Sequence, residues 1–140
     1  MKAYELQPRE GFDSLTLVDR PSRAPQPGEV RVRVRAVSLN YRDLVMARAA
    51  RSRKGPVVPA SDGAGEVVAV GDGVTRFRPG DRVVAAFFPT WKDGPLSEHH
   101  HAHALGSQRD GMLAEEVVLP EAAWLAIPDA LSFEAAATLP

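Results

Sequence analysis

Residues 30–36 alternate strictly between apolar side chains at the even positions and arginine at each odd position. Period two with β-branched residues on one side is typical of a half-buried antiparallel strand. The three arginines, Arg31, Arg33 and Arg35, then form the solvated face of that strand, which is the interpretation we favour. A stripe that binds an anionic ligand is the alternative.

Glycine and proline are spread along the chain, 11 and 12 in 140 residues, and predict many short elements separated by turns. Strands are expected over residues 1–6, 15–19, 30–36, 66–70, 82–88, 112–119 and 124–127. Helices are expected over residues 40–50 and 133–139, the second capped by Ser132, and a short helix within the irregular stretch 89–111. Strand–helix–strand alternation is missing, so the pattern favours a mainly β, partly open barrel over a parallel sheet.

Composition excludes several classes of protein. The chain has no cysteine, which rules out disulfides, zinc ribbons and cysteine nucleophiles. Its 17 basic and 18 acidic residues give a net charge of −1, against the basic face of a nucleic-acid binder. No stretch approaches the roughly 18 apolar residues that span a bilayer, and the charged start lacks a signal core. We therefore expect a cytoplasmic protein with neither nucleic-acid nor membrane partners.

Gly63, Ala64 and Gly65 invite comparison with a dinucleotide-binding loop. That fingerprint needs a third glycine three positions later, where Val68 stands, and then a helix. A valine-rich strand is expected here instead. We therefore favour glycines that permit close backbone approach or a tight bend.

Four histidines lie within residues 99–103. On a helix, His99 and His103 would share a face at positions i and i+4, a workable pair for zinc or copper with Glu98 or Asp93 as third ligand. The cluster falls in the least regular part of the chain, where adventitious nickel or zinc binding is the alternative. We expect no physiological metal here.

An amide, a phenol and a guanidinium meet where the third predicted strand runs into the first predicted helix, at Asn40, Tyr41 and Arg42. Such a corner can polarise a carbonyl or hold an oxyanion. From the residues alone, the simpler interpretation is preferred: Asn40 caps the helix, Tyr41 is partly buried, Arg42 is solvated and Asp43 supports the helix start.

Five segments of the chain, in order and across its whole length, resemble medium-chain dehydrogenases/reductases. Residues 36–43 (AVSLNYRD) resemble the first active-site segment of that family, and 62–71 (DGAGEVVAVG) its glycine-rich strand. Residues 74–83, 111–118 and 127–140 resemble its turn and strand, the strand after its lobe loop and the junction with its second domain. The resemblance implies a GroES-like, partly open β-barrel over residues 1–140, the substrate-side domain of a two-domain reductase.

The same resemblance implies a Rossmann domain that is absent from this chain and that binds NADPH or NADH. No cofactor is therefore expected on the chain alone, which should be inactive. Asn40 stands where the alcohol dehydrogenases of the family have a zinc-binding cysteine, and Ser61 and Asp62 stand where they have a histidine and a glutamate. Amide and hydroxyl groups are not usual zinc ligands, so neither a catalytic nor a structural zinc is expected. The chain looks like the zinc-free quinone and enoyl reductases.

In those branches, the implied reaction is hydride transfer from the nicotinamide to a small-molecule quinone or activated alkene. Asn40 would orient the substrate carbonyl or the nicotinamide carboxamide, and Tyr41 would donate to the oxygen that gains charge. Arg42 is the candidate for an anionic substrate group. The residues expected to support the site structurally are Asp43, Asp62, Gly63 and Gly65.

Two alternatives from other classes stay open. The first is a binding or self-association module, in which the apolar helix over residues 133–139 and an open barrel edge drive docking or a homodimer. The second is a metal-binding protein built on the histidines.

Overall fold

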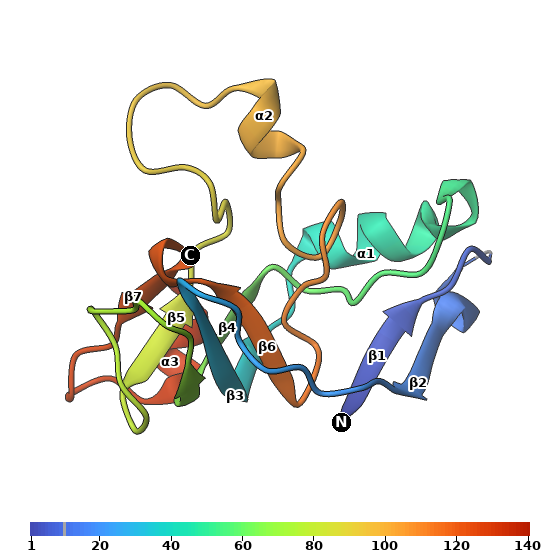
Figure 1. Ribbon diagram of the computed structural model, residues 1–140. Coiled ribbons are helices and arrows are strands. Elements are labelled where there is room, and N and C mark those ends of the chain that lie inside the picture. Colours follow the sequence, from blue (N-terminus) through green and yellow to red (C-terminus); the bar gives the residue numbers. More distant parts are fainter. Residues whose placement is uncertain (10) are drawn as a thin grey trace.

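The computed structural model describes residues 1–9 and 11–140, which form two antiparallel sheets that do not close into a barrel (Figure 1). The first sheet pairs β1 (Lys2–Leu6) with β2 (Leu15–Asp19). The second has the order β6-β3-β4-β5-β7. Its strands are β3 (Glu29–Ser38), β4 (Asp62–Val70), β5 (Arg82–Ala85), β6 (Glu116–Pro120) and β7 (Trp124–Ala126). The expected mainly β, partly open architecture is confirmed.

The helices are short. They are α1 (Tyr41–Arg48), α2 (Glu98–His101) and α3 (Phe133–Ala137), with single 3-10 turns η1 (Phe12–Ser14), η2 (Ala50–Ser52) and η3 (Glu121–Ala123). Each expected helix is present. The first begins one residue later and ends two residues earlier than expected, and the last ends two residues earlier.

The alternating strand behaves largely as its sequence predicts, but Arg31 corrects the expectation of three solvated arginines. It is half-buried, and its Nε lies 3.9 Å from Glu116 Oε2 because β6 pairs alongside. Val30 and Val32 are fully buried, Arg33 and Arg35 are exposed, and β3 pairs antiparallel with both β4 and β6. The two valines belong to the main hydrophobic core cluster. Its buried residues are Val30, Val32, Val67, Phe77, Val83, Ala85, Leu105, Met112, Leu119, Ala123 and Trp124. The strand thus lies between its two neighbours and anchors the larger sheet.

Three strand boundaries differ from the sequence prediction by three or more residues. β4 begins at Asp62 rather than four residues later, because Gly63 and Gly65 pair with β3 despite the low strand propensity of glycine. β5 ends three residues early, and β6 begins at Glu116 rather than at Met112. In each case pairing with a neighbouring strand, a tertiary effect, sets the end of the element.

The apolar helix expected near the end of the chain is partly covered. Ala136 and Ala137 of α3 are buried in a small cluster with Ala64 and Val84 of the larger sheet, so only part of the helix faces outward. Ser132 accepts a hydrogen bond from Ala135 N at 3.1 Å, as expected of a cap. One side of this helix therefore packs against this chain's own sheet, whereas Leu139, just beyond its end, is 66% exposed.

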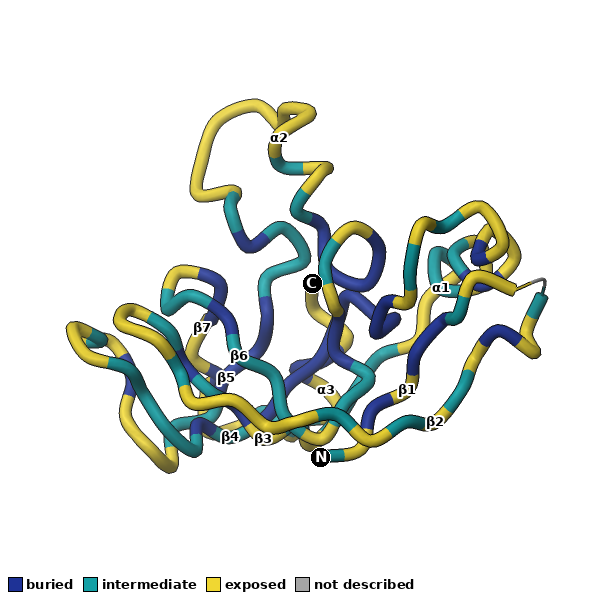
Figure 2. The backbone as a smooth tube through the Cα atoms, turned by 45° about the vertical axis from the view of Figure 1, so that its right-hand side comes forward, coloured by how far each residue is buried: buried dark blue, intermediate teal, exposed yellow. Residues whose placement is uncertain are grey.

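Residues 89–103, which we call the arm, leave the body of the molecule and carry α2 at their far end (Figure 1). Most of the arm is exposed, in contrast to the buried segments below it (Figure 2). The segments that flank the arm are joined at its base, where Leu105 N donates to Phe87 O at 3.2 Å. Within the described part of the chain, no helix has the length and apolar character needed to cross a membrane.

Candidate functional site

The site lies at the corner where β3 ends and α1 begins. Asn40 precedes the helix with an extended backbone, and its N–H donates to Asp43 Oδ2 at 2.8 Å. Asp43 N in turn donates to Asn40 O at 2.9 Å. A carboxylate in the first turn also complements the helix dipole. These local bonds fix the backbone from which the Asn40 side chain projects.

The side chain of Asn40 is held by the neighbouring strand. Its Nδ2 donates to Asp62 Oδ2, across 22 residues of sequence. Asp62 is the first residue of β4 and pairs with Ser38 of β3, which brings it beside the corner. The bond places the nitrogen end of the carboxamide on Asp62 and leaves its Oδ1 as an acceptor for another donor.

Asp62 is only 5% exposed, and burial raises the pKa of its carboxyl group. Hydrogen bonds from Ser61 and Asn40 act in the opposite direction, whereas the charge of Asp43 adds to the rise. Its second oxygen, Oδ1, is buried without a hydrogen-bond partner among the described residues. A buried carboxylate with one unpaired oxygen is costly to keep ionised, which is typical of groups retained at functional sites.

The phenol of Tyr41 lies on an open surface rather than in a core. Tyr41 is 75% exposed, and its neighbour Leu39 is 73% exposed. The structure therefore places the hydrogen-bonded carboxamide of Asn40 and the exposed phenol of Tyr41 on consecutive residues. The interpretation of Tyr41 as a partly buried residue is wrong, because the helix begins with this residue facing outward.

Arg42 contacts two residues at the base of the arm. Its Nη1 donates to Leu105 O at 3.0 Å, and its guanidinium lies 4.7 Å from the centroid of the Phe87 ring. The side chain is half-buried, and burial lowers the pKa of the group. The solvated interpretation of Arg42 is therefore wrong, and Phe87 and Leu105 are site residues that sequence reasoning missed. No local signal marks them, because Leu105 is 63 residues away from Arg42.

The backbone just before Asp62 is strained. Ala60 is fully buried with φ of 67°, the left-handed region that favours glycine. Met112 N donates to Ala60 O at 2.8 Å, and a Cβ added at Gly111 would lie 1.9 Å from that same oxygen. The segment that contains Gly111 and Met112 thus holds Ala60 in place by close backbone contact. Strain retained next to a buried carboxylate is a common feature of functional sites.

Gly63 and Gly65 serve close packing. A Cβ at Gly65 would lie 2.2 Å from Arg33 O, and one at Gly63 would lie 2.8 Å from Met112 Cβ. Both glycines lie inside antiparallel β4, which continues to Val70. This is not the strand–loop–helix arrangement of a dinucleotide loop.

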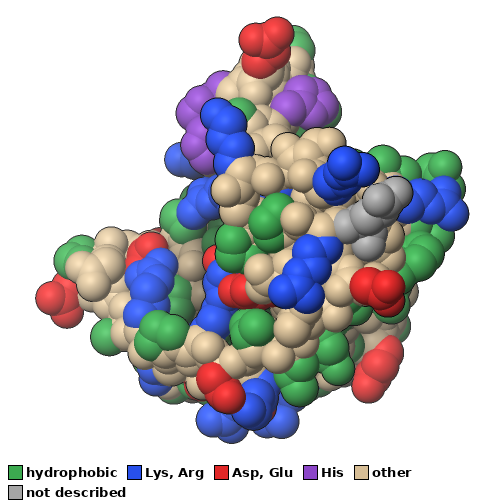
Figure 3. All heavy atoms as spheres, turned by 90° about the vertical axis from the view of Figure 1, so that its right-hand side faces the viewer, with side chains coloured by type: hydrophobic (Ala, Val, Ile, Leu, Met, Phe, Trp, Pro, Cys, Tyr) green, Lys and Arg blue, Asp and Glu red, His purple; other side chains and the backbone are tan. Residues whose placement is uncertain are grey.

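The histidines gather on the projecting arm (Figure 3). The rings of His99 and His103 have centroids 4.4 Å apart, and His103 Nδ1 lies 2.7 Å from His99 O. His100 Nδ1 accepts from Ser97 N at 3.0 Å. Across residues 1–9 and 11–140, no group of three or more histidine, cysteine or acidic side chains forms a candidate metal site. The expected third ligand from Glu98 or Asp93 therefore does not join the histidine pair.

Sequence and structure comparisons place this geometry in context. Residues 26–129 match the alcohol dehydrogenase GroES-like domain family. The chain is 44% identical over 135 residues to a zinc-type alcohol dehydrogenase-like protein of Schizosaccharomyces pombe, covering 93% of this chain and 38% of that protein. It is 38% identical over 130 residues to a quinone oxidoreductase of Pseudomonas aeruginosa, covering 92% of this chain and 34% of that protein.

Solved structures agree with these matches. A crystal structure of an NAD-dependent alcohol dehydrogenase superposes with a TM-score of 0.83 at 38% identity, covering 100% of this chain and 43% of the other. A quinone oxidoreductase of Pseudomonas syringae gives a TM-score of 0.73 at 34% identity, covering 97% and 36%. The chain spans less than half of the length of each of these relatives. It belongs to the alcohol dehydrogenase GroES-like domain family.

Proposed function

We propose that this chain is the substrate-side domain of a zinc-free, NAD(P)H-dependent oxidoreductase. The reaction is reduction of a quinone, an enone or a related activated alkene. The observation that carries the proposal is the bond from Asn40 to Asp62 beside the exposed phenol of Tyr41. A quinone oxidoreductase among the relatives supports the same choice of substrate class.

In the proposed mechanism, Tyr41 donates a hydrogen bond to the substrate oxygen that gains negative charge. A well-placed donor of this kind lowers the activation barrier by about 3 kcal/mol. Asn40 orients a bound group, because Asp62 fixes which end of its carboxamide faces outward. Its Oδ1 accepts from an N–H or O–H of the ligand, and the second Nδ2 hydrogen suits a carbonyl oxygen.

Arg42 has a smaller role in this proposal than the sequence predicted. Its Nη1 is occupied by Leu105 O and its face by the Phe87 ring. The remaining guanidinium N–H groups are still suited to a carboxylate or phosphate on the substrate. We propose contact with an anionic substrate group as secondary to holding the base of the arm.

The donor set at the corner supports a zinc-free site. Asn40, Ser61 and Asp62 offer an amide, a hydroxyl and one carboxylate, and Asp62 Oδ2 already accepts from Asn40. A zinc site needs three or four thiolate, imidazole or carboxylate ligands, so these residues do not fit the metal.

Bound NADPH or NADH supplies the hydride in this class of reaction. Gly63 and Gly65, the glycine pair closest to a dinucleotide fingerprint, lie in an antiparallel strand and do not fit a cofactor cradle. We propose that other parts of a longer protein hold the cofactor and that this chain alone is inactive.

The first test is the intact mass of the protein from its native source, with an assay of NADPH and NADH oxidation by a quinone and an enone. The proposal expects a mass well above the 15.1 kDa of this chain and reduction of at least one substrate. The 140-residue chain assayed alone should show no turnover. A native mass of 15.1 kDa would contradict the proposal and redirect the search to binding partners.

The second test is Tyr41→Phe in the native-length enzyme. The reduction rate should fall about a hundredfold or more, because one donor to the developing oxyanion is lost. Tyr4→Phe, on β1 and 40% exposed, removes the same hydroxyl away from the site and should leave the rate unchanged. An unchanged rate in Tyr41→Phe would remove the phenol from the mechanism.

Self-association is a second candidate, carried by apolar residues around the β1–β2 hairpin rather than by α3. Phe12, Leu15 and Leu17 are 58%, 42% and 52% exposed. We propose a homodimer through this face. Sedimentation velocity at high concentration should show a dimer that Leu17→Glu converts to monomer. A monomer at every concentration would contradict this candidate.

A further inference from the structure

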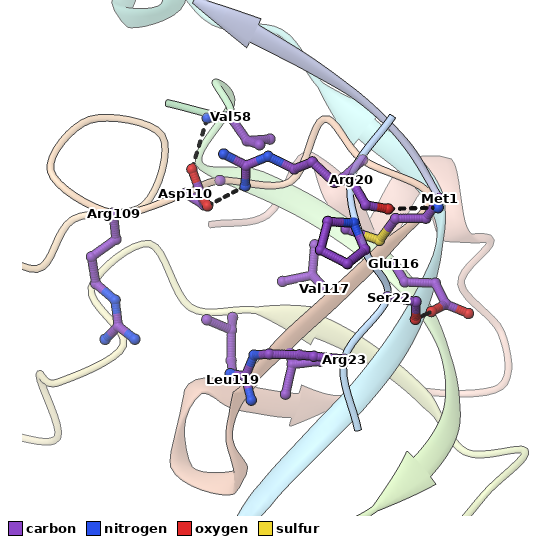
Figure 4. A pocket seen from close by; sticks show the side chains of 14 residues that line it. Met1, Arg20, Ser22, Arg23, Val58, Arg109, Asp110, Glu116, Val117 and Leu119 are labelled. Carbon is purple, nitrogen blue, oxygen red and sulfur yellow. Dashed lines mark hydrogen bonds and ion pairs between the residues drawn. The ribbon is translucent and has the colours of Figure 1, made fainter. Parts of the chain in front are cut away.

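We infer that a cleft away from the Asn40 corner binds the carboxylate of an amphipathic monoanion. The cleft lies between the loop after β2, the loop before β6, and β6 itself, and it encloses about 480 Å³ (Figure 4). That volume is within the range of small-molecule sites in proteins. The inference is independent of the proposed reductase activity.

One wall of the cleft is apolar. Val58, Val117 and Leu119 line it, and the Leu119 side chain lies between the guanidinium ends of Arg23 and Arg109 in the close view (Figure 4). Val58 and Leu119 are already buried, so the surface that a short hydrocarbon chain would remove from water belongs to the half-buried Val117 and Val118. The wall therefore supplies the apolar part of an amphipathic site.

Most polar groups of the cleft are already paired with one another. Arg20 bonds to Asp110, and also to Glu5 at 2.6 Å. Arg23 holds both oxygens of Glu29, at 2.5 and 2.9 Å. Ser22 Oγ donates to Glu116 at 2.5 Å. These pairs stiffen the rim of the cleft, which also holds the Met1 ammonium group, bonded to Arg20 O at 2.8 Å.

Arg109 is the exception. It is half-buried and lines the cleft, yet it forms no hydrogen bond or ion pair with the residues that the structure describes. Its charge helps to lower the pKa of Glu29, which Arg23 already neutralises. A guanidinium in this state presents parallel N–H donors that match the two oxygens of a carboxylate.

The surrounding acids decide the charge of the ligand. Asp110 and Glu116 line the same cleft, and Glu29 lies next to Arg109. A doubly charged phosphate would meet the carboxylates of Asp110 and Glu116 in the cleft and would leave its apolar wall without a partner. A monoanionic carboxylate with an apolar tail fits both the single free guanidinium and the apolar wall.

The test titrates the ¹⁵N-labelled chain with octanoate, with octanol as the neutral probe and acetate as the probe without a tail. Octanoate should produce saturable shifts at the Val58 and Gly111 amides, which border the cleft. Octanol and acetate should each bind at least about tenfold more weakly, since each lacks one half of the recognition.

Arg109→Gln should weaken octanoate about tenfold or more while leaving octanol unchanged. Arg48→Gln removes the same charge from the exposed end of α1 and should bind octanoate like the wild type. If Arg109→Gln perturbs folding, Arg109→Lys keeps the charge without the fork and should bind octanoate with intermediate affinity. Equal binding of octanoate by the wild type and Arg109→Gln, equal binding of octanoate and octanol, or no saturable shift would each overturn the inference.

Discussion

Residues 60–65 and the arm differ in how their backbones are held, although both border the candidate site. In the first region, Ala60 and Gly65 are buried and backbone atoms of crossing segments press directly against them. In the arm, Gly94 has no atom within 4 Å of where a Cβ would stand. Asp62, which the proposed function needs in a fixed position, therefore comes from the tightly packed segment. The exposed arm carries the histidines that most resembled a metal site in sequence.

The largest expected effect is the loss of unfolding free energy when a methyl group is added to a glycine of the tightly packed segment. The same addition in the arm is the comparison. Gly65→Ala should lower the free energy of unfolding by about 3 kcal/mol, because the new Cβ meets the Arg33 carbonyl oxygen of β3. Gly94→Ala should cost only about 1 kcal/mol, because its φ of 71° is strained for alanine but its surroundings are open. Urea denaturation measures both. Equal costs would show that the two regions are packed alike.

Breaking the contact between Arg42 of α1 and the base of the arm should have a smaller, local effect. Arg42→Leu removes one hydrogen bond and one ring contact at the base of the arm, worth about 1–2 kcal/mol together. Trypsin should then cleave at Lys92 in the arm about threefold to tenfold faster, as local opening becomes easier. Arg48→Leu on the exposed side of α1 is the control and should cleave at the wild-type rate.

The buried carboxylate predicts a pH dependence of stability. The raised pKa of Asp62 means that the folded state holds its proton more tightly than the unfolded state does. Its contribution to stability is therefore full below the ordinary aspartate pKa and is lost as pH rises through the folded value. Asp62→Asn should remove that loss, so its stability curve should converge with the wild type at low pH and lie above it at neutral pH.

Asp19→Asn checks the sign of this effect. The bond to Lys2 holds the pKa of Asp19 below its usual value, so its contribution is lost as pH falls, the opposite direction. Chemical denaturation at a series of pH values separates the two. An Asp62→Asn curve parallel to that of the wild type would contradict the raised pKa.

The smallest effect is expected from metal ions at the arm. Two histidines without a third ligand hold zinc weakly, so about ten micromolar zinc should leave the Tm unchanged. Calorimetric titration of the wild type and of His99→Ala with His103→Ala measures this directly. Sub-micromolar zinc binding that the double variant loses would show that the arm is a metal site after all.

Sequence reasoning succeeded where the determining contacts are local. The alternation in β3, the bond between Asn40 and Asp43, and the Ser132 cap all join residues at most a few positions apart. It failed where tertiary contacts decide. Nothing near Asn40 in sequence indicates a bond to Asp62, because strand pairing alone brings the two together.

The errors at the ends of elements have the same cause. The start of β4 was placed too late, because two glycines weaken the local strand signal while β3 still pairs with them. Arg42 was predicted to be solvated, because its partners Phe87 and Leu105 lie far along the chain. A family resemblance supplied the catalytic interpretation of the corner, which neither composition nor periodicity could provide.

The central claim is that Asp62 holds the Asn40 carboxamide in one orientation. The most direct test follows the Asn40 side-chain amide signals by ¹H–¹⁵N NMR across a pH titration of the whole chain. The account predicts two well-separated amide protons that shift with a midpoint above the usual aspartate pKa, and no such titration in Asp62→Asn. Asn40 amide protons that keep the chemical shifts of a solvated asparagine and do not respond to pH in the wild type would contradict it.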